Sequence, residues 1–179
     1  IAQQDSRRIT LKVKLHDYSL NKLQEIGFRF ELRSDNLIQG TIPETKHSEL
    51  TSLPFFLSYT FAETAVQYAL TNEAVNHTRA NFAHSFGLTG KGVKVAVIDV
   101  GFEPSLIQFT QNVKEIRSFR FDGNIRAENP QHGVAVAEVL VGVAPDVELY
   151  LYNAETEVEF VNAVDFAIRR NVNIISTSV

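Results

Sequence analysis

"GKGVKVAVIDVGFEP", residues Gly90 to Pro104, is the segment from which most of the fold can be inferred. Its glycines are followed by a nearly continuous apolar run, which is typical of a strand buried on both faces of a parallel sheet. The run ends in the carboxylate of Asp99. Because strands often end in polar turn residues and Asp-x-Gly is a common turn, Asp99 indicates a functional site only if a partner for it stands elsewhere in the chain.

The start of a later predicted helix supplies such a partner. The segment "QHGVAVAEVLVGVAP" (Gln131–Pro145) has the composition of a helix that begins near His132. A helix N-terminus fixes the position of an imidazole, and a carboxylate at a neighbouring strand end can accept its Nδ1 proton and hold the other ring nitrogen toward a nucleophile. Gly133 allows another backbone to approach closely. Each residue alone is more often structural, but together Asp99 and His132 are candidates for two members of a catalytic triad.

The segments around this pair predict an α/β fold. The order strand, helix, strand, helix, strand predicts a doubly wound parallel sheet, in which ligands bind beyond the carboxyl ends of the strands. Asp99 lies at one such end. The helix expected at Glu157–Asn171 is amphipathic, with Ala167 and Ile168 among the residues on its apolar face. The further strands are expected at "VELYLYN" (Val147–Asn153) and "VNIISTSV" (Val172–Val179).

Residues 1–62 predict a separate, small α+β domain. "ITLKVKL" (Ile9–Leu15) alternates apolar and polar residues, the pattern of a half-buried strand. The segments that follow indicate a helix, two strands joined as a hairpin, a second helix with Pro43 in its first turn, and a last strand. This β-α-β-β-α-β order is the split ferredoxin-like plan. Residues 63–87 are expected to form a linker and a helix that ends at Gly87, and residues 88–179 form the second region.

The composition excludes several classes of function. The chain has 179 residues, of which 44% are apolar and 21% charged, and this is a globular composition. A net charge of −4 without a basic cluster argues against nucleic acid or an anionic membrane as a partner, and no apolar run approaches the roughly 18 residues of a membrane-spanning helix. The sequence has no cysteine, its other histidines lack metal-ligand spacing, and no glycine-rich loop follows a strand as dinucleotide sites require. No cofactor or metal is therefore predicted.

Three segments of the second region resemble the subtilisin-like serine proteases, or subtilases. In that family the catalytic Asp lies in G-x-G-V-x-V-A-V-I-D-[ST]-G, the catalytic His lies in H-G-T-x-V-A followed by G-V-A-P, and a later strand reads V-I-N-x-S-L. The triad order is Asp, His, Ser, and Asp99 and His132 match the first two. The corresponding segments here are "GLTGKGVKVAVIDVGFE" (Gly87–Glu103), "HGVAVAEVLVGVAP" (His132–Pro145) and "FVNAVDFAIRRNVNIISTSV" (Phe160–Val179).

The resemblance implies that residues 88–179 are the N-terminal half of a catalytic domain. It implies a serine endopeptidase that acts on protein or peptide substrates, with Ser178 and Val179 as substrate contacts, and a secreted or periplasmic location. Residues 1–62 resemble the family's propeptide, an intramolecular partner that assists folding and blocks the active site with its C-terminal segment, here Phe56 to about Tyr68. Structural calcium is common in the family, but no Asp-rich loop marks a site in this sequence.

The sequence departs from the family at positions that bear on activity. No Gly-Thr-Ser-x-Ala segment occurs, so the nucleophile is missing, and the family's oxyanion-hole asparagine would fall beyond Val179. Because loss of such a donor alone lowers the rate about 100- to 1,000-fold, we expect the 179 residues to form an incomplete sheet and to be inactive by themselves. Val100 and Val134 replace the hydroxyl-bearing residues that follow Asp and His-Gly in the family.

Three interpretations of the function remain open. The chain is the front part of a working endopeptidase, or a pseudoprotease that binds peptides or a partner protein, or a protein whose first region inhibits or chaperones a protease in trans. The acidic residues after the second strand of the sheet leave two further alternatives: they favour basic residues in a substrate, or they stabilise the start of a helix. These residues are Glu155, Glu157 and Glu159.

Overall fold

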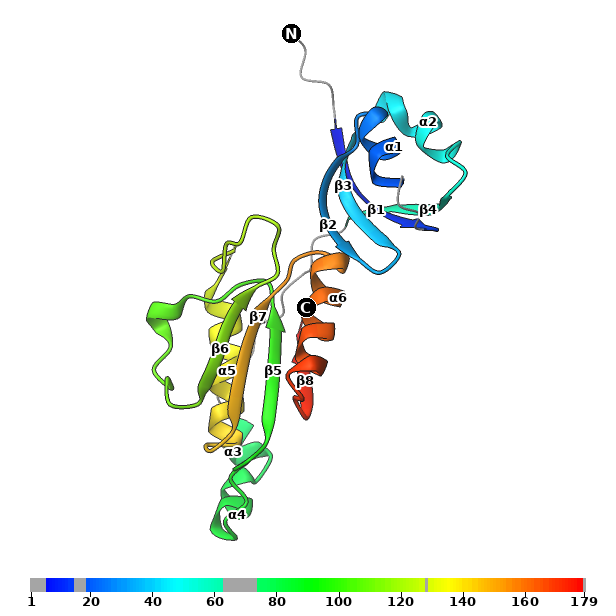
Figure 1. Cartoon of the computed structure of the whole chain (residues 1–179). Helices are drawn as coiled ribbons and strands as arrows, with labels where there is room; N and C mark the ends of the chain where they lie inside the picture. Colours follow the sequence, from blue (N-terminus) through cyan, green and yellow to red (C-terminus); the bar gives the residue numbers. More distant parts are fainter. Residues whose placement is uncertain (1–5, 15–18, 63–73, 128, 179) are drawn as a thin grey trace. The chain divides into compact units, whose positions relative to one another are not determined.

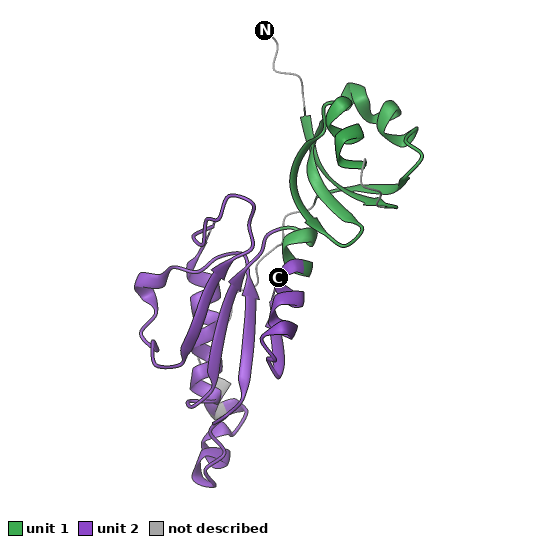
Figure 2. Cartoon of the chain, viewed as in Figure 1, with its two compact units in different colours: residues 1–64, 156–161 green, residues 65–155, 162–179 purple. Residues whose placement is uncertain are grey.

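The computed structural model of the chain describes residues 6–14, 19–62, 74–127 and 129–178. The chain divides into two compact units, which Figure 2 shows in different colours. Unit 1 is Ile1–Thr64 with Thr156–Val161, and unit 2 is Ala65–Glu155 with Asn162–Val179.

Unit 1 is built on a four-stranded antiparallel sheet with the strand order β2-β3-β1-β4 (Figure 1). The observed order of strands and α-helices agrees with the β-α-β-β-α-β order expected from the sequence. The elements are β1 (Ser6–Val13), α1 (Ser19–Glu25), β2 (Arg29–Ser34), β3 (Leu37–Pro43), the 3-10 helix η1 (Glu44–Lys46), α2 (His47–Thr51) and β4 (Phe56–Phe61).

The core of unit 1 lies between one face of this sheet and its two helices. Because side chains alternate between the faces of a strand, β1 contributes every second residue to the core. The predicted hairpin of β2 and β3 is confirmed. Pro43 ends β3 and precedes η1, so the second predicted helix begins as a 3-10 turn. The fully buried core residues include Ile9, Leu11, Val13, Leu23, Ile38, Ile42, Leu50 and Phe55.

Unit 2 is built on a four-stranded parallel sheet with the order β6-β7-β5-β8 (Figure 1). Strand β5 lies between β7 and β8, so both of its edges are paired. None of the helices in the described part of the chain is long and apolar enough to cross a membrane. The elements are α3 (Ala74–His77), α4 (Ala80–Ser85), β5 (Lys94–Asp99), the 3-10 helix η2 (Pro104–Leu106), β6 (Val113–Ser118), α5 (Gln131–Val143), β7 (Glu148–Asn153), α6 (Glu157–Arg169) and β8 (Ile174–Thr177).

Helices cover both faces of the parallel sheet. Tyr152 of β7 points to the face opposite Leu151, because successive strand residues alternate. Its ring meets the ring of Phe166 in α6, with centroids 5.6 Å apart. Helix α5 therefore lies on one face and α6 on the other, as a sheet buried on both faces requires. The core on the α5 face includes Val95 and Val97 of β5, Leu149 and Leu151 of β7, and Val134, Val136 and Ala137 of α5.

Two local predictions in unit 2 are wrong. The helix expected to end at Gly87 is two short helices, because Arg79 has a left-handed φ of 56° just before α4 begins. Ile168, expected on the apolar face of α6, is 61% exposed, whereas Ala163 and Ala167 are buried. Ile168 lies about 100° further around the helix than Ala167, and this rotation is enough to turn it toward solvent.

Candidate active site

Asp99 is the last residue of β5, at the carboxyl end of the central strand pair. Its side chain is fully buried, with 0% exposure. Carboxylate oxygen Oδ1 accepts a hydrogen bond of 2.9 Å from the backbone N–H of Val100, and the main-chain carbonyl accepts one of 2.9 Å from Ala154. The sheet thus holds the carboxylate at the edge where parallel sheets bind ligands.

His132 is the second residue of α5 and is 7% exposed. Its Nδ1 lies 2.9 Å from Oδ2 of Asp99, so the structure brings together the two residues that the sequence analysis singled out. An ionised carboxylate accepts and cannot donate, and this contact therefore assigns the proton to Nδ1. Nε2 is then the ring nitrogen whose lone pair can take up a proton.

Two glycines let the backbone segments around this pair touch. A Cβ built on Gly133 would lie 2.4 Å from the carbonyl oxygen of Gly101 and 2.7 Å from a ring carbon of Phe102. A Cβ on Gly101 would lie 2.8 Å from the backbone nitrogen of Ala127. The close approach predicted for Gly133 is confirmed, and it brings the first turn of α5 against the turn that follows Asp99.

Asn153 is a residue that the sequence analysis treated only as the end of a strand. It is fully buried and lies opposite Asp99 in the register of β5 and β7. Its Nδ2 donates to the carbonyl of Asn124 at 2.8 Å and approaches that of Val100 at 3.4 Å. The available signal was a polar residue closing an apolar strand next to the strand that ends in Asp99.

An arginine at the carboxyl end of β6 neutralises one of the acidic residues that follow β7. Arg120 donates to both carboxylate oxygens of Asp122, at 3.1 and 2.9 Å, and also pairs with Glu155. The hydrogen bond from Arg120 lowers the pKa of the Asp122 carboxyl. Glu155 is therefore engaged in an internal ion pair.

The later acidic residues lie at the start of α6. The Glu159 carboxylate accepts a 3.2 Å hydrogen bond from the backbone N–H of Thr156, which is one half of a capping box. Glu157 is exposed in the first turn, where a carboxylate stabilises a helix. These contacts favour the helix-start interpretation over a preference for basic substrates.

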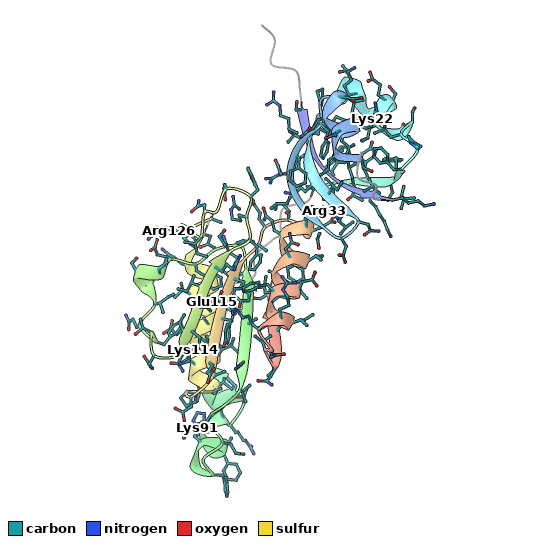
Figure 3. The ribbon with its side chains drawn as sticks, in the orientation of Figure 1. Lys22, Arg33, Lys91, Lys114, Glu115 and Arg126 are labelled. Atoms are coloured by element: carbon teal, nitrogen blue, oxygen red, sulfur yellow. The ribbon has the colours of Figure 1, made fainter. Side chains whose placement is uncertain are left out.

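A second ion pair ties together the loops beyond the strand ends. Arg126 donates to Glu103 at 2.8 Å, and the same carboxylate accepts from the hydroxyl of Ser105 at 2.7 Å. The hydrogen bonds from Ser105 and Arg126 lower the pKa of Glu103 to about 2. Figure 3 shows Arg126 at the carboxyl end of the sheet and Lys91 at its opposite end.

The remaining predicted site residues are Ser178 and Val179. Ser178 follows β8, and its Oγ is buried. Val179 lies outside the described residues, so both substrate contacts stay predictions. Among the residues that the structure describes, no three His, Asp or Glu side chains gather in a group that could hold a metal ion.

No profile of a known protein family matches the sequence, but individual proteins do. The minor extracellular protease Vpr of Bacillus subtilis is 33% identical over 110 residues, in an alignment that covers 52% of this chain and 14% of Vpr. Subtilisin E of the same species is 28% identical over 160 residues, covering 80% of this chain and 42% of subtilisin E. The human membrane-bound transcription factor site-1 protease is 27% identical over 123 residues, covering 62% of this chain and 12% of that protease.

Solved structures share the fold. A variant of the epidermin leader peptide processing serine protease of Staphylococcus aureus superimposes with a TM-score of 0.73 at 13% identity, over 97% of this chain and 50% of that one. Fervidolysin of Fervidobacterium pennivorans, a keratinolytic enzyme related to subtilisin, superimposes with a TM-score of 0.63 at 11% identity, over 99% of this chain and 36% of that one.

The parallel sheet places this chain in the α/β class, with a fold shared by subtilisin-like enzymes. Together with the sequence relatives, this fold shows that the chain is related to the subtilisin-like serine proteases. The chain spans at most half of the length of each of these relatives.

Proposed function

We propose that this chain is the front part of the catalytic domain of a subtilisin-like serine endopeptidase. The observation that carries the proposal is the 2.9 Å contact between Asp99 Oδ2 and His132 Nδ1, buried at the carboxyl end of β5. The nucleophilic serine would come from a segment outside these 179 residues.

In the proposed reaction each residue of the pair has its own role. Asp99 keeps the proton on Nδ1 and fixes the orientation of the ring. Nε2 of His132 takes the proton of the serine hydroxyl as that hydroxyl attacks the peptide carbonyl, and later gives it to the leaving amine. The carboxylate stabilises the imidazolium that forms in between. A general base held in this way contributes about 100- to 10,000-fold to the rate.

The substrate is proposed to be a protein or peptide, since the relatives of this chain are proteases. Ser178 is proposed to contact the substrate backbone, because it follows β8 at the carboxyl edge of the sheet that also holds Asp99. Val179 is proposed as a second contact because it is the next residue in the segment that resembles the family's strand. No specificity for basic residues is proposed, since Glu155 pairs with Arg120 and Glu159 caps α6.

A hydrolysis assay on the full product of the gene that encodes this chain tests the proposal. We expect turnover of a peptide substrate and labelling by a fluorophosphonate, and neither from the 179 residues alone. His132→Ala in the full product should lower kcat by about 10⁴-fold or more, beyond the general-base contribution alone, because the residues of a triad act as a unit. His84→Ala is the matched control, because that ring contacts the carbonyl of Val143 at the other end of α5, at 2.8 Å. Turnover that survives both Asp99→Ala and His132→Ala would contradict the proposal.

A second candidate function is the binding of peptides or a partner protein without hydrolysis. The family pattern has hydroxyl-bearing residues beside the aspartate and the histidine. The valines that replace them here, Val100 and Val134, have no hydroxyl, and both are buried. Calorimetric binding of a peptide to the full gene product, without turnover and without fluorophosphonate labelling, would favour this function over the first.

Residues 1–62 are proposed to act as a propeptide-like partner of the second region. The support is the element order of unit 1 and its strand order β2-β3-β1-β4, which fit the ferredoxin-like plan. Leu11→Asp places a carboxylate in the core of unit 1 and should lower the refolding yield of unit 2 if unit 1 assists its folding. The segment from Phe56 to about Tyr68 is described only as far as residue 62.

The protein is proposed to be secreted or periplasmic. The support is the relative Vpr, which is named as an extracellular protease. Immunoblots of the culture medium, periplasm and cytoplasm of the native host test this location, and confinement to the cytoplasm would contradict it.

A further inference from the structure

The buried amide of Asn153 has no part in the reaction proposed above. Its Nδ2 lies 2.8 Å from the carbonyl oxygen of Asn124, 3.4 Å from that of Val100 and 3.5 Å from that of Ile125. These acceptors belong to two chain segments that are far apart in sequence. Because an NH₂ group has two protons to donate, one side chain can hold both segments at once.

Both segments lead directly to the Asp–His pair. Val100 follows Asp99, and its N–H binds the Asp99 carboxylate at 2.9 Å. The Val100 carbonyl that Asn153 approaches belongs to the next peptide unit, which is joined to that N–H through the Val100 Cα, so a side chain that holds this carbonyl restrains the turn directly after the carboxylate. The Ile125 carbonyl accepts the backbone N–H of Phe102 at 2.9 Å, and the ring of Phe102 packs against Gly133, the residue after His132. Asn153 therefore connects the aspartate side of the pair with the histidine side.

Asn153 is itself held firmly by the sheet. It is paired with Asp99 in the register of β7 and β5. The N–H of the next residue, Ala154, donates to the Asp99 carbonyl at 2.9 Å. The carbonyl of Asn153 accepts from the N–H of Phe119 at 3.0 Å. The Asn153 side chain is fully buried and donates to the Asn124 carbonyl at 2.8 Å, and side chains locked by packing and hydrogen bonds orient the groups they bind.

We propose that Asn153 is a positioning residue that sets the hydrogen bond between Asp99 and His132. It acts through the Val100 peptide group and the Asn124–Ile125 segment and touches no reacting atom. The inference rests on the proposed function only in naming the pair as catalytic, since the geometry that Asn153 holds is a property of this chain alone.

The opposite end of the same sheet offers a matched control. Asn112 is also buried, and its Nδ2 donates to the carbonyls of Pro145 at 2.8 Å and Val147 at 3.0 Å. The Oδ1 atoms of both asparagines lack a hydrogen-bond partner among the described residues. Asn112 and Asn153 are thus two buried amides with the same chemistry, and only one of them lies beside the Asp–His pair.

The experiment measures the exchange of the His132 Nδ1 proton with water by ¹H NMR, in the full product of the gene that encodes this chain. We expect Asn153→Ala and Asn153→Ser to speed this exchange about tenfold, the factor that corresponds to the loss of one buried hydrogen bond. Asn112→Ala and Asn112→Ser should change it by less than about twofold, because distant sites act independently. Chemical denaturation of each variant shows whether it is folded, and the serine variants leave the smaller cavity.

The outcomes distinguish a positioning role of Asn153 from a purely structural one. If all the variants lose stability but the exchange rate rises only at position 153, the positioning role is supported. A folded Asn153→Ser chain with the exchange rate of the parent overturns it. If the parent chain shows no protected Nδ1 proton, the Asp–His pair is not formed in solution, and both this inference and the proposed function fail. If the pair forms but the full gene product is inactive, only the proposed function fails.

Discussion

The two ends of the parallel sheet use buried polar side chains in different ways. At the amino end, the buried amide of Asn112 donates to the main-chain carbonyls of Pro145 at 2.8 Å and Val147 at 3.0 Å. At the carboxyl end, two ionisable side chains, Asp99 and His132, bind one another. Both arrangements satisfy buried polar groups, as a folded chain requires.

This difference between the two ends indicates that the carboxyl end is the candidate functional end of the sheet. Backbone groups at a strand end can be satisfied by neutral amides, as the amino end shows. Burying a carboxylate against an imidazole is not needed for that purpose, because desolvation of a charge is costly and apolar replacements of buried ion pairs are often neutral or stabilising. The carboxyl end therefore carries a cost in stability that the proposed reaction accounts for.

The largest expected effect is on the contact between α5 and the turn after Asp99. Gly133→Ala would place a Cβ 2.4 Å from the carbonyl of Gly101, and we expect the free energy of unfolding in urea to fall by about 3 kcal/mol. Gly92→Ala, at the amino end, meets no atom within 4 Å and has a φ of +81°. It should cost only the backbone strain of about 1–2 kcal/mol. Equal losses for the two variants would mean that the two ends are packed alike.

The next effect is on the ion pairs beyond β6. Arg120→Ala leaves Asp122 and Glu155 without their shared cation, and we expect the free energy of unfolding to fall by about 1–2 kcal/mol, with part of the interaction screened by solvent. Lys114→Ala is the control, since this exposed side chain donates to the carbonyl of Gln111 at 3.2 Å, a contact within its own segment. It should cost below about 0.5 kcal/mol. If Lys114→Ala lowered the free energy of unfolding as much as Arg120→Ala, the ion pairs of Arg120 would not be the cause of the loss.

A smaller effect on stability, with a clear spectroscopic change, is expected for Asp99→Asn. The Val100 N–H is a donor and will keep the amide oxygen facing it, so the new NH₂ group must face His132 Nδ1. Two donors cannot bind one another, and the neutral ring should therefore move its proton to Nε2. ¹⁵N NMR of the two ring nitrogens measures this change of tautomer. Persistence of the Nδ1 proton would show that the carboxylate does not select it.

The smallest effect is expected at Glu103, which is partly exposed. Its pKa is lowered from 4.5 to about 2 by Ser105 and Arg126, so its contribution to stability is full above pH 4.5 and is lost as the pH falls toward 2. Thermal unfolding of the parent chain and of Glu103→Gln should differ at pH 7 and converge across this window. A difference that stays constant down to pH 2 would contradict the role of the ionised carboxylate.

The contacts that the sequence predicted are those whose signal is local. The apolar run before Asp99 and the helix that starts near His132 were readable because a buried strand and a helix start leave characteristic residues side by side. The hairpin of unit 1 was readable for the same reason, from alternation on either side of a short polar turn.

The contacts that the sequence did not predict join residues through the backbone or across long separations. Asn153 binds carbonyl groups, which every residue carries, so no residue type marks its partners. Glu155 pairs with Arg120, which is 35 positions away in the sequence. The break between α3 and α4 depends on the left-handed φ of Arg79, and there is no glycine at that position to indicate it. Ile168 was misplaced because neighbouring residues on a helix differ by a rotation that periodicity alone resolves poorly.

The position of β5 also has a consequence for the order of folding. Its partners lie far downstream, so that Lys94 is joined to Asn173 across 79 positions, and the sheet of unit 2 is dominated by contacts of high sequence separation. Such topologies have a high contact order and fold slowly, because the entropy of closing long loops is lost before the contacts form. The sheet of unit 1 is complete within the first 61 residues and can form first. A chain leaving the ribosome would thus carry the folded sheet of unit 1 before β5, which ends in Asp99, has paired with β7 and β8.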